Sequence, residues 1–209
     1  AALAGFLLFA ALTACSSSRA AASPADLSAV FAKKDVTIAV TDSGFGGLSI
    51  MAEAAARMKT AGTFRSVKLV FYNALFAADS GYNSLRDRGL KIAVFSRALE
   101  GLERRFSPDL ILVGCNTLSV ITAETPFAKR TKIPVLDIVD PGIELMAKGL
   151  SADPRATAVI LGTETTIGEG EHARRLAALG YGPERVVPQA CPELANFIES
   201  GPGSDEVAL

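Results

Sequence analysis

The sequence predicts an α/β fold built on a parallel sheet, and three observations lead to this prediction. Short β-branched apolar runs recur from residue 36 onward, and the segments between them carry apolar residues at helical spacing. Polar or glycine-rich residues directly follow several of these runs. Strands that alternate with helices form a parallel sheet. Because ligands bind beyond the carboxyl ends of such strands, the residues after each strand are the first candidates for a site.

Six apolar runs predict buried strands in this sheet. They cover residues 36–41, 67–72, 110–114, 134–139, 158–162 and 185–188. The clearest helix is predicted over residues 90–106, where Leu90, Val94, Ala98 and Leu102 follow one another at intervals of four. These four side chains form one apolar stripe, which we expect to pack against the sheet.

The composition excludes several classes of protein. The chain has 209 residues, of which 49% are hydrophobic and 21% charged, so it can form one packed domain or two small ones rather than a disordered chain. Its 21 basic and 22 acidic residues give a net charge of −1, so we expect no nucleic acid partner. The cysteines, Cys15, Cys115 and Cys191, are far apart and accompany one histidine, which predicts neither a metal site nor a disulfide scaffold.

The N-terminal residues are typical of an export signal. Residues 1–14 carry no charge, and the stretch is too short for a membrane-spanning helix, which needs roughly 20 residues. Residues 12–15, Leu-Thr-Ala-Cys, resemble the lipobox of bacterial lipoproteins, in which the cysteine is lipidated. We therefore expect a signal peptide over 1–14, in which the sequence begins, and a lipidated Cys15 that opens a Ser/Ala-rich tether over 15–35.

This interpretation places the protein in the periplasm, anchored by lipid to the cell envelope, and Ser16 favours the outer membrane. The alternative is an ordinary signal peptide with a chance cysteine at position 15.

The first predicted strand is followed by Asp42, Ser43 and a glycine-rich turn. A dinucleotide fingerprint would need a third glycine where Ser49 stands and an acidic residue after the second strand, where Asn73 stands. The turn instead suits the approach of a small anionic ligand to the start of the next helix. Asp42 either caps that helix or uses its charge for something other than substrate attraction.

The third predicted strand is followed by Cys115, Asn116 and Thr117. A cysteine at this junction directs its sulfur toward the amides of the next helix, which predicts a lowered thiol pKa and a nucleophile or base. The alternative is an inert buried cysteine. Asn116 and Thr117 favour the reactive interpretation, because they supply neutral donors and acceptors beside the sulfur.

Five short motifs at the strand ends resemble glutamate racemase, of the aspartate/glutamate racemase superfamily, in order from about residue 36 to residue 201. They are Asp42-Ser43-Gly-x-Gly-Gly-Leu48-Ser49, Cys115-Asn116-Thr117, Asp140-Pro141-Gly142-Ile143, Gly162-Thr163-Glu164-x-Thr166-Ile167 and Cys191-Pro192-Glu193-Leu194. The resemblance implies two similar parallel-sheet α/β lobes with the active site between them, the first over about 36–115 and the second over about 116–209. It also implies that the C-terminal part is missing and the chain is truncated.

The resemblance implies racemisation of an acidic amino acid, with L- and D-glutamate as the first pair, without cofactor or metal. In this family two thiols flank the α-carbon, one acting as base and the other as acid. Cys115 matches the first thiol, Asp42 would assist it, and Glu199 would lie near the second. The residues implied in substrate binding are Ser43, Tyr82, Asn116, Thr117 and Thr166.

The sequence departs from the family at several points. The Gly-Cys-Thr-His segment that carries the second thiol is absent, so the chain would hold half of the site. Cys191 matches a non-catalytic cysteine, and we interpret it as structural. His172 is predicted to lie on the surface of a solvated helix. Of the Pro-Tyr-Gly segment that contacts substrate, only Tyr82 is kept, which leaves the choice of substrate open.

Two other functions stay open at this point. An exported amino-acid-binding lipoprotein could keep the fold without catalysis, because D-glutamate for peptidoglycan, the cell-wall polymer, is consumed in the cytoplasm. An aspartate racemase or a related dicarboxylate isomerase is the other. The expected partners are a small acidic amino acid and, through Cys15, a membrane; a homodimer is left open.

Overall fold

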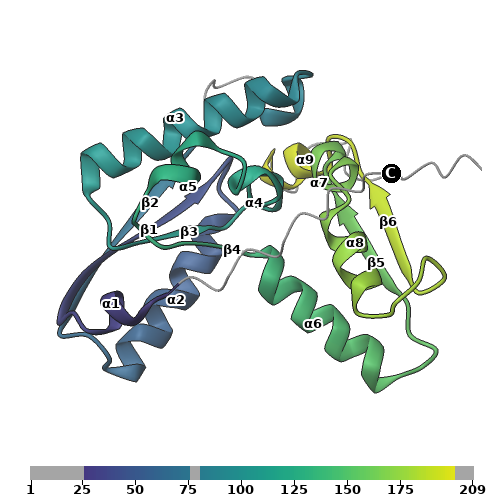
Figure 1. The fold of residues 1–209 in the computed structure, drawn as a ribbon, viewed down its shortest axis with the longest axis horizontal. Coiled ribbons are helices and arrows are strands. Elements are labelled where there is room, and N and C mark those ends of the chain that lie inside the picture. The colour runs from purple at the N-terminus through teal and green to yellow at the C-terminus, as the bar shows by residue number, and fades with distance from the viewer. Residues whose placement is uncertain (1–25, 76–80, 201–209) are drawn as a thin grey trace, which may run out of the picture.

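A computed structural model describes residues 26–75 and 81–200 and confirms the α/β fold (Figure 1). Four strands form a parallel sheet in the order β2-β1-β3-β4, and two more form a second parallel sheet, β5-β6. The strands are β1 (Asp35–Asp42), β2 (Ser66–Asn73), β3 (Leu110–Val113), β4 (Val135–Asp137), β5 (Ala158–Gly162) and β6 (Val186–Ala190). Their bounds differ from those predicted by at most two residues.

The helices cover the first sheet on both sides and the second on one side. Figure 1 shows α1 and α2 on one side of the first sheet, α3 and α5 on the other, and α7 and α8 against the second sheet. The helices are α1 (Ser28–Phe31), α2 (Gly47–Ala61), the 3-10 turn η1 (Tyr82–Ser84), α3 (Arg88–Phe106), α4 (Asn116–Thr122), α5 (Pro126–Arg130), α6 (Val139–Ala152), α7 (Glu164–Gly168), α8 (Glu171–Ala178) and α9 (Leu194–Ser200). The predicted helix over 90–106 begins at Arg88, because the side chain of Asp87 caps it by accepting from the Leu90 N–H at 2.6 Å.

The strand order brings the ends of β1 and β3 together. β1 lies between β2 and β3, and Thr41 is paired in register with Tyr72 on one side and with Val113 on the other. The chain leaves β1 toward β2, while β3 lies on the opposite side, so the crevice outside their carboxyl ends is a switch point of the sheet. Asp42 and Cys115 both lie at this point, because each closely follows Thr41 or Val113.

Two glycines allow α2 to begin against these strand ends. A Cβ atom on Gly114 would lie 3.2 Å from Cδ1 of Ile50 and 3.3 Å from Cα of Gly47. A Cβ atom on Gly47 would lie 3.0 Å from Cβ of Asp42. Because both contacts are tighter than ordinary packing allows, glycine at these positions is what lets the helix approach the site so closely.

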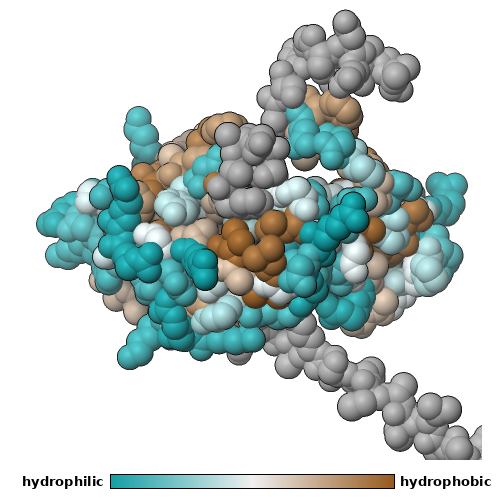
Figure 2. Space-filling model, turned by 90° about the horizontal axis from the view of Figure 1, so that it is seen from above, coloured by the Kyte–Doolittle hydropathy of each residue, from teal (hydrophilic) through white to brown (hydrophobic). Residues whose placement is uncertain are grey.

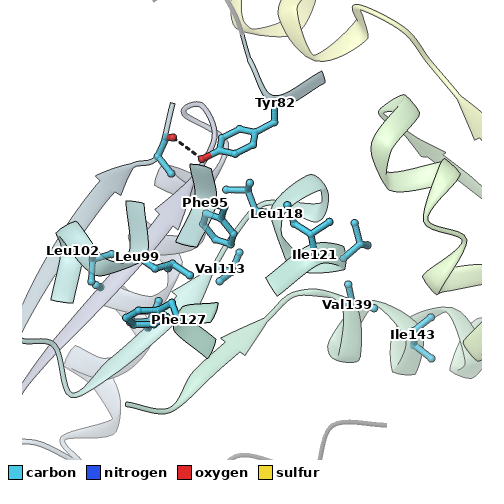
Figure 3. Close-up of a cluster of buried hydrophobic side chains, with 14 of the residues drawn as sticks. Tyr82, Phe95, Leu99, Leu102, Val113, Leu118, Ile121, Phe127, Val139 and Ile143 are labelled. Carbon is cyan, nitrogen blue, oxygen red and sulfur yellow. Dashed lines mark hydrogen bonds between the residues drawn. The ribbon is translucent and has the colours of Figure 1, made fainter. Parts of the chain in front are cut away.

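The main core runs from the first sheet into the second. Figure 3 shows part of this cluster, in which α4 and α6 carry side chains that face each other between the two sheets. Its largest members are Tyr82, Phe95, Leu99, Leu102, Ile111, Leu118, Ile121, Phe127 and Leu176. Since burying one such side chain stabilises a fold by roughly 1.5–3 kcal/mol, this cluster ties the two sheets together.

Sheet membership moves the expected boundary between the lobes. β4 pairs with β3 through Val113 and Asp137, so the first sheet extends to residue 137 and does not end near residue 115. The chain then continues through α6 to the second sheet. The loops that end β3 and the helix α4 therefore belong to the first lobe.

The prediction of a surface position for His172 is wrong. Its side chain is 7% exposed, and Leu176, four residues later in α8, is fully buried. Residues four apart share one face of a helix, so both point into the core. The charged residues around His172 suggested solvent, and they do keep partly or fully exposed positions while the imidazole is buried. Burial lowers the pKa of His172; the charge of Glu171 opposes this shift, and the charge of Arg175 adds to it.

The surface of the described residues is mostly polar, with some exposed hydrophobic side chains. Figure 2 shows a largely hydrophilic face on which hydrophobic residues gather near the middle. On the second sheet Val159, Leu161 and Val187 are exposed while Ile160 is buried, so one face of this sheet packs and the other faces solvent. Within residues 26–75 and 81–200 no helix is long and apolar enough to cross a membrane. The predicted signal peptide and Cys15 lie outside these residues.

Candidate active site

A cavity of about 330 Å³ lies between the two sheets, walled by the segments that follow β1, β3, β5 and β6. This is the position expected of a site at the carboxyl ends of parallel strands. The predicted site residues that line it are Asp42, Ser43, Tyr82, Cys115, Asn116, Thr117 and Thr166. Glu199 lies in α9, and its side chain is outside the described part of the chain.

Cys115 occupies the N-cap position of α4, as the strand-to-helix junction predicts. Its side chain is half-buried, and its Sγ lies 3.1 Å from Oγ of Ser43. Backbone N–H groups of Leu118 and Ser43 also lie near the sulfur and favour its thiolate form. The sulfur is therefore surrounded by donors suited to a negative charge.

The predicted lowering of the Cys115 pKa is nevertheless wrong, because the structure raises it. Burial disfavours the charged thiolate and is the larger cause, and the negative charge of Asp42 adds to it. The hydrogen bonds from Ser43 and Leu118 oppose this shift without outweighing it. The thiol form of Cys115 is therefore favoured over the thiolate near neutral pH.

Asp42 is a buried carboxylate at the end of β1, with an exposed fraction of 6%. Its Oδ1 accepts a hydrogen bond from the N–H of Gly44 at 2.9 Å. The helix that follows has Gly46 at its N-cap and no side-chain cap, so Asp42 closes the turn after β1 rather than capping α2. Its charge is thereby held beside the thiol of Cys115.

Three threonine hydroxyls join the two lobes across the cavity. Thr117 in α4 lies 2.8 Å from Thr163 and 3.4 Å from Thr166, which are 3.0 Å from each other. Thr163 is the N-cap of α7 and accepts from the N–H of Thr166 at 3.2 Å. No role for Thr163 was predicted from the sequence, although it lies in the motif over residues 162–167. The signal that could have found it is its N-cap position directly after β5.

Tyr82 lines the cavity but uses its hydroxyl elsewhere. The residue is 2% exposed, and its hydroxyl donates to the carbonyl oxygen of Ala74 at 2.9 Å (Figure 3). Its ring packs edge-on against Phe95, with centroids 6.2 Å apart. Burial raises the pKa of Tyr82 well above its ordinary range. Its contact with substrate stays a prediction, and its observed role is to hold the cavity wall.

Asn83 and Cys191 also line the cavity, although neither was predicted to belong to the site. Asn83 accepts from the hydroxyl of Thr165 at 2.7 Å through its Oδ1. Cys191, interpreted as structural, follows β6 and is half-buried at the same cavity. Its N–H donates to the carbonyl oxygen of Gly162 at 2.8 Å, which fixes the backbone beside the sulfur. Among the described residues, no three His, Cys, Asp or Glu side chains are grouped so that they could hold a metal ion.

The fold and the site together define a class of protein, a two-lobed parallel α/β protein with a carboxylate, a thiol and paired hydroxyls between its lobes. Within this class the chain is similar to glutamate racemases, which confirms the resemblance drawn from its motifs. It is 26% identical over 166 residues to the enzyme of Desulforudis audaxviator, covering 79% of this chain and 55% of that protein. It is 29% identical over 144 residues to the enzyme of Campylobacter jejuni, covering 69% and 53%.

The solved structures give the same result. The crystal structure of the Campylobacter jejuni glutamate racemase superposes with a TM-score of 0.66 at 25% identity, covering 82% of this chain and 64% of that one. A glutamate racemase from Francisella tularensis, solved in complex with D-glutamate, shares the fold with a TM-score of 0.55 at 20% identity. No family model matches the chain. The chain spans about half the length of the curated relatives it matches.

Proposed function

We propose that the protein racemises an acidic amino acid, with glutamate as the first candidate substrate, by proton abstraction and return at the α-carbon. One observation carries this proposal. The thiol of Cys115, with the hydroxyl of Ser43 at 3.1 Å and the buried carboxylate of Asp42 nearby, faces the cavity between the lobes. The similarity to glutamate racemases supports glutamate over other acidic amino acids.

The first step of the proposed reaction forms the base. The ammonium group of the substrate binds near the thiol of Cys115 and favours its thiolate form, which offsets the burial and the Asp42 charge that raise the thiol pKa. The thiol proton then passes from Sγ of Cys115 to the carboxylate of Asp42. Ser43 and the N–H of Leu118 stabilise the thiolate through their hydrogen bonds.

In the second step the thiolate accepts the α-proton, and the electron pair of the broken C–H bond delocalises into the α-carboxylate of the substrate. A proton delivered to the opposite face then gives the mirror-image amino acid. By resemblance the group that delivers it is a second thiol in a Gly-Cys-Thr-His segment, which these 209 residues do not contain. Neither step uses a cofactor.

The hydroxyl groups supply the substrate contacts in this proposal. Thr117, Thr163 and Thr166 can turn their O–H groups from one another toward a carboxylate, which accepts strong hydrogen bonds. Asn116 opens α4 beside Cys115 and adds an amide donor. We also propose the export and lipid anchoring that residues 1–15 suggest, which puts this chemistry outside the cytoplasm.

Chiral chromatography after incubation with each enantiomer of glutamate and aspartate tests the proposal. We expect the full-length protein, with the second thiol that the resemblance implies, to convert glutamate in both directions, and its Cys115→Ser variant to convert neither enantiomer. Calorimetry on the same samples separates racemisation from simple binding. Tight binding of glutamate by the wild-type protein with no conversion would favour the binding lipoprotein and contradict the proposal.

A further inference from the structure

The start of α3, in the first lobe, is bound to the end of α7, in the second. The guanidinium of Arg88 donates to Glu169 through Nε at 2.6 Å and through Nη2 at 2.9 Å. The same group donates to Glu124, which follows α4, at 2.7 Å through Nη1 and 2.6 Å through Nη2. Arg88 thus pairs with two carboxylates, each through two hydrogen bonds, in a group that we call the Arg88 clamp.

A second polar contact joins the middle of α7 to the first lobe. Nζ of Lys91, one turn after Arg88, donates to the hydroxyl of Thr165 at 2.6 Å. That hydroxyl donates in turn to Oδ1 of Asn83 at 2.7 Å. Together with the threonine hydroxyls at its start, α7 is therefore tied to the first lobe along its whole length.

These contacts differ in what a ligand would do to them. Thr117, Thr163 and Thr166 line the cavity, so a carboxylate that takes their O–H groups breaks the hydrogen bonds between them. Arg88, Glu124 and Glu169 do not line it. Glu169 is largely buried, with a side-chain exposure of 15%. A carboxylate bound in the cavity would therefore not compete for the hydrogen bonds of the Arg88 clamp.

We infer that Arg88 is a positioning residue, which holds α7 against the first lobe so that Thr163 and Thr166 stay opposite Cys115 when a ligand binds. The inference rests on the geometry of the clamp, and only its kinetic consequence rests on the proposed function. It predicts that opening the clamp exposes Cys115 and weakens substrate binding without altering the reacting groups.

Alkylation of Cys115 by iodoacetamide, followed by peptide mass spectrometry, tests the clamp without any need for activity. We expect Arg88→Ala to label Cys115 about fivefold faster than wild type, as for loss of a partly exposed charge network. Glu169→Gln keeps the size of the side chain and removes its charge, so it decides the matter if Arg88→Ala does not fold. Arg88→Lys keeps the charge but cannot form the paired hydrogen bonds, so its rate of Cys115 labelling should lie between those of the wild type and Arg88→Ala.

The matched control is Arg57→Ala, which removes an exposed Arg–Glu pair, 2.7 Å from Glu53, within α2. It should label Cys115 at the wild-type rate. Wild-type labelling rates in both Arg88→Ala and Glu169→Gln would overturn the inference.

Steady-state kinetics provide the second readout. Opening the clamp should raise KM several-fold while kcat stays within about twofold, because binding is weakened and the reacting groups are untouched. A fall in kcat at constant KM would overturn the inference. Faster labelling in proteins that racemise nothing would support the clamp and refute the proposed function. Racemisation with labelling and KM unchanged would do the reverse.

Discussion

The thiol of Cys115 stands between groups with opposite effects on its ionisation. Burial and the carboxylate of Asp42 raise its pKa above the ordinary value of 9.0, whereas the hydroxyl of Ser43 lowers it. This balance explains why a cysteine at a helix start can favour its thiol form. The contributions of Asp42 and Ser43 can each be removed by a single substitution.

Two substitutions should therefore move the Cys115 pKa in opposite directions. Asp42→Asn removes a negative charge and should lower it, and Ser43→Ala removes a stabilising hydrogen bond and should raise it further. The pH dependence of iodoacetamide labelling at Cys115 reports the pKa, because only the thiolate reacts. A pKa that stays the same or rises in Asp42→Asn would contradict this account of the site.

His172 makes a prediction about stability against pH. Because burial lowers its pKa from the ordinary value of 6.5, the unfolded chain binds more protons than the folded one below that pH. The contribution of His172 to stability is therefore fully present above pH 6.5 and is lost as the pH falls through the lowered folded-state pKa.

Urea unfolding at pH 7.5 and 5.5 measures this effect. The wild-type protein should lose more free energy of unfolding between the two pH values than His172→Leu does. The comparison is specific, because the sequence contains one histidine. Equal losses in the two proteins would show that His172 titrates alike in the folded and unfolded chains.

At the scale of elements, the site depends on how closely α2 approaches the ends of β1 and β3. Gly114→Ala places a Cβ atom 3.3 Å from Cα of Gly47, where the backbone must move. We expect a loss of about 1–3 kcal/mol in the free energy of unfolding. Faster labelling of Cys115 should accompany it, since the helix moves away from the thiol.

Gly149→Ala is the matched control for this substitution. Gly149 lies within α6, and a Cβ atom there would meet nothing within 4 Å. Because alanine favours a helix over glycine, this variant should gain roughly 0.5–1 kcal/mol. Urea unfolding of both variants checks the pair. A Gly114→Ala protein as stable as wild type would show that the close approach of α2 is not required.

At the scale of the whole molecule, the sequence predicted those site residues that directly follow a strand. Asp42 and Cys115 could be found because each follows a strand with a clear apolar pattern, and a parallel sheet brings such ends together. The lobe boundary was less clear, because β4 has only three residues and its pairing with β3 depends on the fold.

The features that could not be predicted depend on contacts between distant segments. The raised pKa of Cys115 comes partly from Asp42, 73 positions earlier, so the local helix start alone suggested the opposite shift. Thr163 and Arg88 likewise act through partners in the other lobe. His172 was misjudged because its sequence neighbours are charged while its helix face is buried.

Solvent deuterium exchange at the α-carbon tests the central claim, that the thiol of Cys115 abstracts the α-proton. The measurement is proton NMR of L-glutamate in D2O with the wild-type protein, Cys115→Ser and, as the matched thiol control, Cys191→Ser. We predict loss of the α-proton signal with the wild type and with Cys191→Ser, and a signal that persists with Cys115→Ser. Exchange at the wild-type rate in Cys115→Ser, or no exchange with the wild type, would contradict the account.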